Sequence, residues 1–74
     1  VDPEVAAAGR ELAGQLEAAL AALPPKQRAA LLLSRMDGLD YVDVGTALGC
    51  SEGAVKALVF RATQTLKAAL RDFL

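Results

Sequence analysis

The residues that specify this protein's architecture run from 40 to 59 and read DYVDVGTALGCSEGAVKALV. Asp40 and Ser51 can each cap a helix, because their side chains accept hydrogen bonds from the free N–H groups of a first turn. Gly49 is typical of a helix end. The apolar residues of the first part share one face over about two turns: Tyr41, Val44 and Leu48. The stretch therefore predicts a short helix at 41–48, a turn, and a longer helix from 52.

This order of helix, turn and helix is typical of a helix-turn-helix. The arrangement needs a very small residue where the helices cross, a turn residue that tolerates positive φ, and a branched apolar residue between the helices. Gly45, Gly49 and Val55 supply them in that order. We expect Gly45 to lie against the second of these helices near Val55. An ordinary helical hairpin within a bundle is the alternative.

Two further helices are predicted upstream. Pro24 and Pro25 end the first, because proline lacks an N–H and restricts its predecessor, and Gly38 ends the second. The first helix has one apolar stripe at spacings of three and four: Val5, Ala8, Leu12, Leu16, Ala19, Leu20 and Leu23. The last helix has another: Val55, Val59, Ala62, Leu66, Ala69 and Phe73. The sequence predicts an all-α, four-helix domain over 1–74 that contains a helix-turn-helix without a wing, with helices at about 3–23, 25–37, 41–48 and 52–73.

Composition excludes several classes of function. The 74 residues include no histidine or tryptophan, and Cys50 is the only cysteine. Disulfide frameworks, cysteine/histidine zinc sites and histidine-based catalysis are excluded within this chain, and Asp40 and Asp43 are interpreted as capping groups. We expect no enzymatic activity, no metal and no cofactor. The longest apolar runs, 18–23 and 29–33, are too short to cross a bilayer, so no membrane insertion is expected and a cytoplasmic location is predicted.

Charge is distributed unevenly along the chain. The net charge is −1, which alone argues against binding to nucleic acid. Residues 1–23 carry four acidic side chains and one basic side chain, whereas residues 24–74 carry seven basic and five acidic ones. The positive charge is concentrated in the last third, and its location matters more to a partner than the total.

Four blocks of sequence resemble region 4 of bacterial sigma factors. They are LPPKQR at 23–28, DGLDY at 37–41, LGCSEGAVK at 48–56 and RA at 61–62. The likeness covers nearly all of residues 16–72, and it is greatest to the extracytoplasmic-function group of the sigma-70 family. The resemblance implies a domain that binds the −35 element of double-stranded promoter DNA and docks on the β flap of the RNA polymerase core. It also implies an anti-sigma factor as a further partner.

The resemblance also implies a set of DNA-facing positions. The residues of this chain at those positions are Ser51, Glu52, Gly53, Ala54, Lys56, Ala57, Phe60 and Arg61. Two segments differ from the family's usual residues: Ala57 and Leu58 stand where serine and arginine are usual, and residues 63–65 replace further basic residues. Few positive charges then face the DNA, so we expect the isolated domain to bind DNA weakly and with strong salt sensitivity.

Three other residues are assigned from the sequence. Gln27 and Arg28 begin the second predicted helix, where they can contact phosphates, and an internal ion pair is the alternative for Arg28. Leu58 lies at the edge of the buried stripe of the last helix. Our hypothesis for Leu58 is a contact with a protein partner, and an isolated apolar residue on the surface is the alternative.

Two other functions compete with promoter recognition. One is the output domain of a response-regulator or quorum-sensing transcription factor, which uses a similar four-helix unit. The other is an adaptor that kept the fold, lost its DNA affinity and binds protein. The acidic first helix and the few basic residues on the last helix favour the adaptor, whereas the LPP block and the spacing from Lys56 to Arg61 favour the sigma factor.

Overall fold

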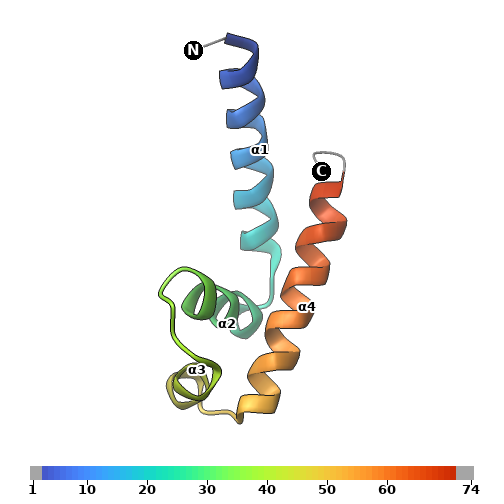
Figure 1. Cartoon of the computed structure of the whole chain (residues 1–74). Coiled ribbons are helices and arrows are strands. Elements are labelled where there is room, and N and C mark those ends of the chain that lie inside the picture. The colour runs from blue at the N-terminus through green and yellow to red at the C-terminus, as the bar shows by residue number, and fades with distance from the viewer. Residues whose placement is uncertain (1–2, 72–74) are drawn as a thin grey trace.

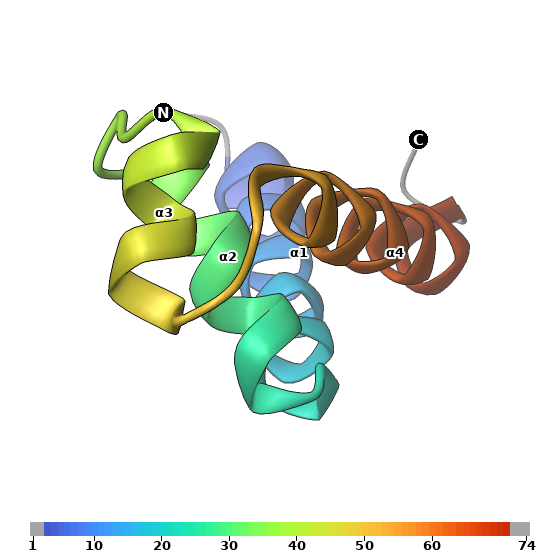
Figure 2. The same ribbon diagram turned by 90° about the horizontal axis from the view of Figure 1, so that it is seen from below.

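The computed structural model describes residues 3–71, which form four helices and no strand. The helices are α1 (Pro3–Ala22), α2 (Pro25–Arg35), α3 (Tyr41–Leu48) and α4 (Glu52–Leu70). The two long helices, α1 and α4, rise side by side from a base formed by α2 and α3 (Figure 1). Seen from below, α2 lies between α3 and α1 (Figure 2). The all-α fold class is therefore confirmed.

The ends of α2 follow from proline and glycine chemistry. Pro24 is the N-cap residue with extended backbone angles, and Pro25 occupies the first helical position, where a missing N–H costs nothing. The helix ends at Arg35, two residues earlier than its predicted end. Gly38 then takes a φ of 70°, and the Leu39 N–H donates to the Leu33 carbonyl. This left-handed turn redirects the chain into α3.

Both helices of the helix-turn-helix begin at a side-chain cap. Asp40 accepts a hydrogen bond from the Asp43 N–H at 2.9 Å, and Ser51 accepts one from the Ala54 N–H at 3.1 Å. Between them, Gly49 ends α3 with a φ of 70°, and the Cys50 N–H donates to the Gly45 carbonyl at 2.9 Å. This bond is the one that closes a Schellman motif. Local chemistry therefore specifies both ends of the turn.

Gly45 lies where the backbone of the following turn comes very close to α3. A methyl group added at Gly45 would lie 2.5 Å from the carbonyl oxygen of Cys50, and its nearest other neighbours are backbone atoms of Cys50 and Ser51. The atoms nearest to Gly45 thus belong to the turn and to Ser51, the cap of α4, and none of these three belongs to Val55. The chain reverses so tightly after Gly49 that the backbone of the turn lies directly beside Gly45.

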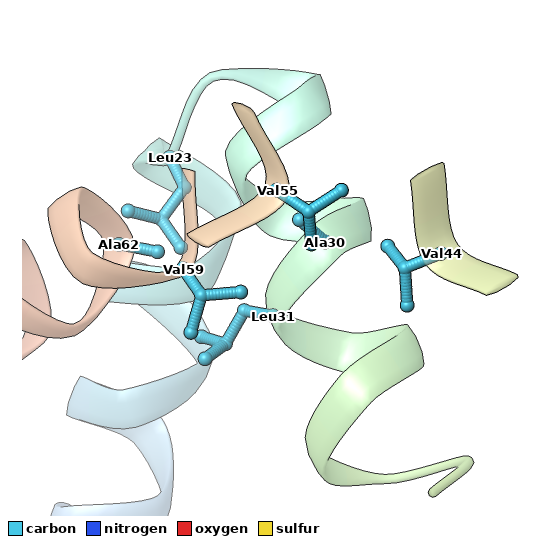
Figure 3. Close-up of a cluster of buried hydrophobic side chains, with 7 residues drawn as sticks. All are labelled: Leu23, Ala30, Leu31, Val44, Val55, Val59 and Ala62. Atoms are coloured by element: carbon cyan, nitrogen blue, oxygen red, sulfur yellow. The ribbon is translucent and has the colours of Figure 1, made fainter. Parts of the chain in front are cut away.

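The core is a small cluster at the base of the molecule. Val44 of α3 and Val55 of α4 are its largest fully buried side chains, and Val55 lies beside Ala30 of α2 (Figure 3). The buried apolar residues are Leu23, Ala30, Leu31, Val44, Val55, Val59 and Ala62. The half-buried residues packed against them are Leu20, Leu33, Tyr41, Leu48, Cys50, Leu58 and Leu66. The core therefore holds α2, α3 and the first half of α4 together.

The helix α1 contributes little to this core. None of its residues is buried, and only Leu23, just beyond its end, joins the cluster. Several residues of the predicted apolar stripe are exposed instead: Val5, Ala8, Leu12 and Leu16. Helical periodicity gives these residues a common face, but α1 packs only near its C-terminal end. On α4 the predicted stripe is buried as far as Ala62, half-buried at Leu66 and exposed at Ala69, while Phe73 lies outside the described residues.

Candidate nucleic-acid interface

The first half of α4 has a buried side and an exposed side. Val55, Val59 and Ala62 are buried, and Figure 3 shows Val55 and Val59 directed towards α2. The residues between them on the helix surface are exposed: Glu52, Gly53, Lys56, Ala57, Phe60 and Arg61. We refer to these six residues as the recognition face. The helical repeat of 3.6 residues thus separates the side that packs from the side that is free to meet a partner.

The remaining two predicted DNA-facing positions differ in character. Ser51 is exposed, but its hydroxyl oxygen already accepts the Ala54 N–H that begins α4. Its hydroxyl proton remains available to a phosphate oxygen, since a serine hydroxyl both donates and accepts. Ala54 is half-buried. The predicted set therefore comprises six exposed helical residues, one capping residue and one residue at the edge of the packed side.

The recognition face carries groups that fit the edges of DNA bases. Lys56 and Arg61 can donate to guanine O6 and N7, and Glu52 can accept from cytosine N4. Phe60 is 64% exposed, so its ring can contact the methyl group of thymine, as can the methyl group of Ala57. Glu52 also lies in the first turn of α4, where the helix dipole stabilises its charge.

A groove runs along one side of α4, where α4 faces the end of α2 and the start of α3. It encloses about 280 Å³. The lining residues are Arg35, Tyr41, Lys56, Val59, Phe60, Thr63, Gln64 and Lys67. We call it the basic groove, because three of its residues are cations and none is acidic. It shares Lys56 and Phe60 with the recognition face.

Arg35 and Lys67 were not predicted from the sequence to belong to a binding site. For Lys67 a signal was available, because Lys56, Phe60, Thr63 and Lys67 follow one another at spacings of four, three and four on α4. No such signal exists for Arg35, which lies on α2 and reaches the groove only through the packing of α2 against α4.

A second hollow lies beside the basic groove, at the N-terminal end of α4. It encloses about 350 Å³ and is lined by Ser34, Arg35, Leu39, Asp40, Tyr41 and Glu52. We call it the mixed hollow, because its two carboxylates outnumber its one cation. Arg35 and Tyr41 line both cavities and mark the boundary between them.

Arg28 and Leu58 have contacts inside the domain. The Arg28 guanidinium donates to the Ala21 carbonyl at 3.2 Å, which ties the start of α2 to the end of α1. The Leu58 side chain is half-buried and packs against the core. Gln27 is half-buried in the first turns of α2. All three lie outside the recognition face and the basic groove.

Residues 3–71 hold neither a cluster of metal-binding side chains nor a membrane-spanning helix. No three histidine, cysteine or acidic side chains of this part of the chain are gathered as metal ligands would be. Among the helices described, none combines the length and apolar character needed to cross a membrane. Cys50 is a half-buried free thiol in the turn before α4.

Comparison with known proteins identifies the family. The family "Sigma-70, region 4" matches residues 13–66. The chain is 38% identical over 73 residues to the ECF RNA polymerase sigma factor SigE of Mycolicibacterium smegmatis, covering 99% of this chain and 27% of that protein.

Two further relatives agree. The chain is 33% identical over 72 residues to the RNA polymerase sigma-H factor of Pseudomonas aeruginosa, covering 97% of this chain and 37% of that protein. It is 41% identical over 56 residues to the ECF RNA polymerase sigma factor EcfG of Rhodopseudomonas palustris, covering 76% of this chain and 31% of that protein. The chain thus spans about a third of the length of these relatives. It belongs to the sigma-70 region 4 family.

Proposed function

We propose that this domain recognises the −35 element of promoter DNA as part of an alternative sigma factor and so directs transcription initiation. The observation that carries the proposal is the recognition face: six exposed residues on the first half of the second helix of a helix-turn-helix. Such a helix reads base edges from the major groove while the first helix crosses the DNA backbone. Family membership supports this function over a response-regulator output domain.

The proposed mode of binding follows from the dimensions of a helix. An α-helix with its side chains is about 10–12 Å across, and the major groove is about 12 Å wide. Inserted into the groove, α4 directs the recognition face at the base edges. Lys56 and Arg61 are assigned to guanine, Glu52 to cytosine, and Phe60 with Ala57 to thymine methyl groups.

The RNA polymerase core is the proposed protein partner, through its β flap, and an anti-sigma factor is proposed to compete for the same domain. Exposed apolar side chains at the end of α2 and the start of α3 support a protein-binding surface there. Met36 is 77% exposed and Val42 57% exposed. The two flank the turn between these helices, in which Leu39 is also partly exposed. Leu58 is proposed only as a minor contact, because it already packs against the core.

The test is selection of duplexes from a randomised DNA pool by the purified chain. We expect one short motif to be enriched. Lys56→Ala and Arg61→Ala should weaken binding of the enriched duplex and relax selectivity at one base pair each, since a good bidentate contact discriminates by about 1–3 kcal/mol. Arg10→Ala is the matched control, because Arg10 is an exposed cation on α1 away from the recognition face.

The same experiment separates the competing functions. If no motif is enriched and both alanine variants bind as the parent does, promoter recognition by this chain is refuted. Retained binding to RNA polymerase core in that case would identify the chain as a protein-binding adaptor.

A further inference from the structure

We infer that the basic groove binds the sugar–phosphate backbone of one strand of the DNA duplex, with Arg35 and Lys67 as phosphate contacts beyond the recognition face. This inference rests on the proposed function. It assigns two residues that neither the sequence motif nor the comparisons point to.

The charge of the groove is the first argument. Arg35 comes from α2, and Lys56 and Lys67 come from α4 at positions eleven residues apart, a rise of about 16 Å. Within residues 3–71 none of the three cations forms an ion pair or hydrogen bond that would satisfy it. Three such cations without a carboxylate among them fit a run of phosphates, which presents one negative charge per nucleotide of the strand.

The basic groove lies on a side of α4 that would face the phosphates if the helix entered the major groove of DNA. Because a helix fills the major groove, its two sides must each approach one of the two phosphate walls. On α4 these sides are unequal. The side that forms the basic groove carries Lys56 and Lys67, whereas the opposite side carries one cation, Arg61, among Ala57, Thr65 and Ala68.

The position of Tyr41 indicates where the DNA backbone would pass over the domain. Tyr41 begins α3, the first helix of the helix-turn-helix, and it lines the groove beside Arg35. In this class of fold the first helix crosses the DNA backbone. The backbone that meets the start of α3 therefore passes the mouth of the basic groove. The mixed hollow next to it is unsuited to phosphate, because Asp40 and Glu52 line it.

Salt-dependent binding tests the assignment. Binding of the enriched duplex and of a random duplex is measured for the parent, Arg35→Ala, Lys67→Ala and the double variant between 50 and 200 mM salt. Each single variant should lower the salt slope by about 0.9, the value for one phosphate contact on duplex DNA. The double variant should lower it by about 1.8, and both duplexes should weaken by the same factor, because phosphate contacts carry no sequence information.

Two control variants test whether the change in salt slope comes from the loss of a positive charge in the basic groove. Arg35→Lys should keep most of the parental slope, because a point charge suffices for a phosphate, and Arg10→Ala should keep all of it. Both target side chains are exposed, so the melting temperatures of the variants should coincide with that of the parent.

Several outcomes would overturn the inference. If Arg35→Ala and Lys67→Ala keep the parental slope while Lys56→Ala and Arg61→Ala weaken binding, the basic groove does not contact DNA and the proposed function stands. A loss of selectivity in place of a loss of slope would assign these residues to bases. If only binding to RNA polymerase core weakens, the groove is a protein contact. If none of the four alanine variants changes DNA binding, the proposed function fails as well.

Discussion

The two ends of this molecule use the same apolar periodicity to different effect. In the helix-turn-helix, Val44 and Val55 are completely buried, and each helix begins at a side-chain cap. In α1, apolar residues recur at equally regular spacings from Val5 to Leu16 and remain exposed. The difference shows that a repeat of three and four predicts a helix and its apolar face, whereas burial also requires a second surface at the right distance.

The largest expected difference comes from a matched pair of valines. Val55→Ala should lower the free energy of unfolding by about 2–3 kcal/mol, because it removes two buried carbon atoms and leaves a cavity in a core of seven residues. Val5→Ala removes the same atoms from a side chain that is 64% exposed. It should change stability by less than about 0.5 kcal/mol. Chemical denaturation of both variants measures the contrast, and equal losses would show that Val5 is buried in solution.

The next largest difference is expected between two glycine-to-alanine substitutions, one in the helix-turn-helix and one on α1. Gly45→Ala should cost about 1–3 kcal/mol, because the added methyl group meets the Cys50 carbonyl and the backbone must move. Gly14→Ala on α1 has no atom within 4 Å of the new methyl group. It should raise stability by up to about 1 kcal/mol through helix propensity. Opposite shifts in melting temperature are the expected result, and a Gly45→Ala melt that overlays the parent's would contradict the tight turn.

Removing a cap should have a smaller effect. Ser51→Ala deletes the acceptor for the Ala54 N–H and should cost about 1 kcal/mol. Ser51→Asp keeps an acceptor and places a negative charge at the positive end of α4, so it should retain the parental stability. Thermal unfolding distinguishes them. If both variants lose the same amount, the hydroxyl stabilises the domain through some other contact.

The smallest effect is expected for Leu16→Gln in the exposed stripe of α1. Leu16 is at the edge of exposure and belongs to no buried cluster, so the free energy of unfolding should change by less than about 0.5 kcal/mol. Denaturant unfolding measures it. A loss of 2 kcal/mol or more, well above the ~0.5 expected, would mean that the stripe is covered in solution.

Features determined by neighbouring residues could be predicted from the sequence. Asp40, Ser51 and Gly49 act within their own turns, so their residue types were sufficient to locate α3 and the start of α4. The exposed positions of the recognition face followed from helical period and motif together.

Features that depend on the approach of distant segments could not be predicted. Arg35 lines the same groove as Lys67 only because α2 packs on α4, and Arg28 meets the Ala21 carbonyl only across the bend at Pro24. The position of Gly45 was recognised, but the atoms that require it belong to a backbone turn whose path the sequence does not reveal. The exposure of α1 depends on how far α4 diverges from it.

The helix α1 is held mainly at its C-terminal end, where it joins α2, so a small rotation at that end moves its N-terminal end a long way. With 20 residues the helix is about 30 Å long, and it begins at the far end of the molecule from α3 (Figure 1). Buried Leu23, the restricted backbone of Pro24 and the bond from Arg28 to Ala21 hold the C-terminal end. A rotation of about 10° at this joint would displace the other end by about 5 Å, a turn's length of helix. A displacement of that end therefore acts both on this joint and on the contacts that α1 makes with α4.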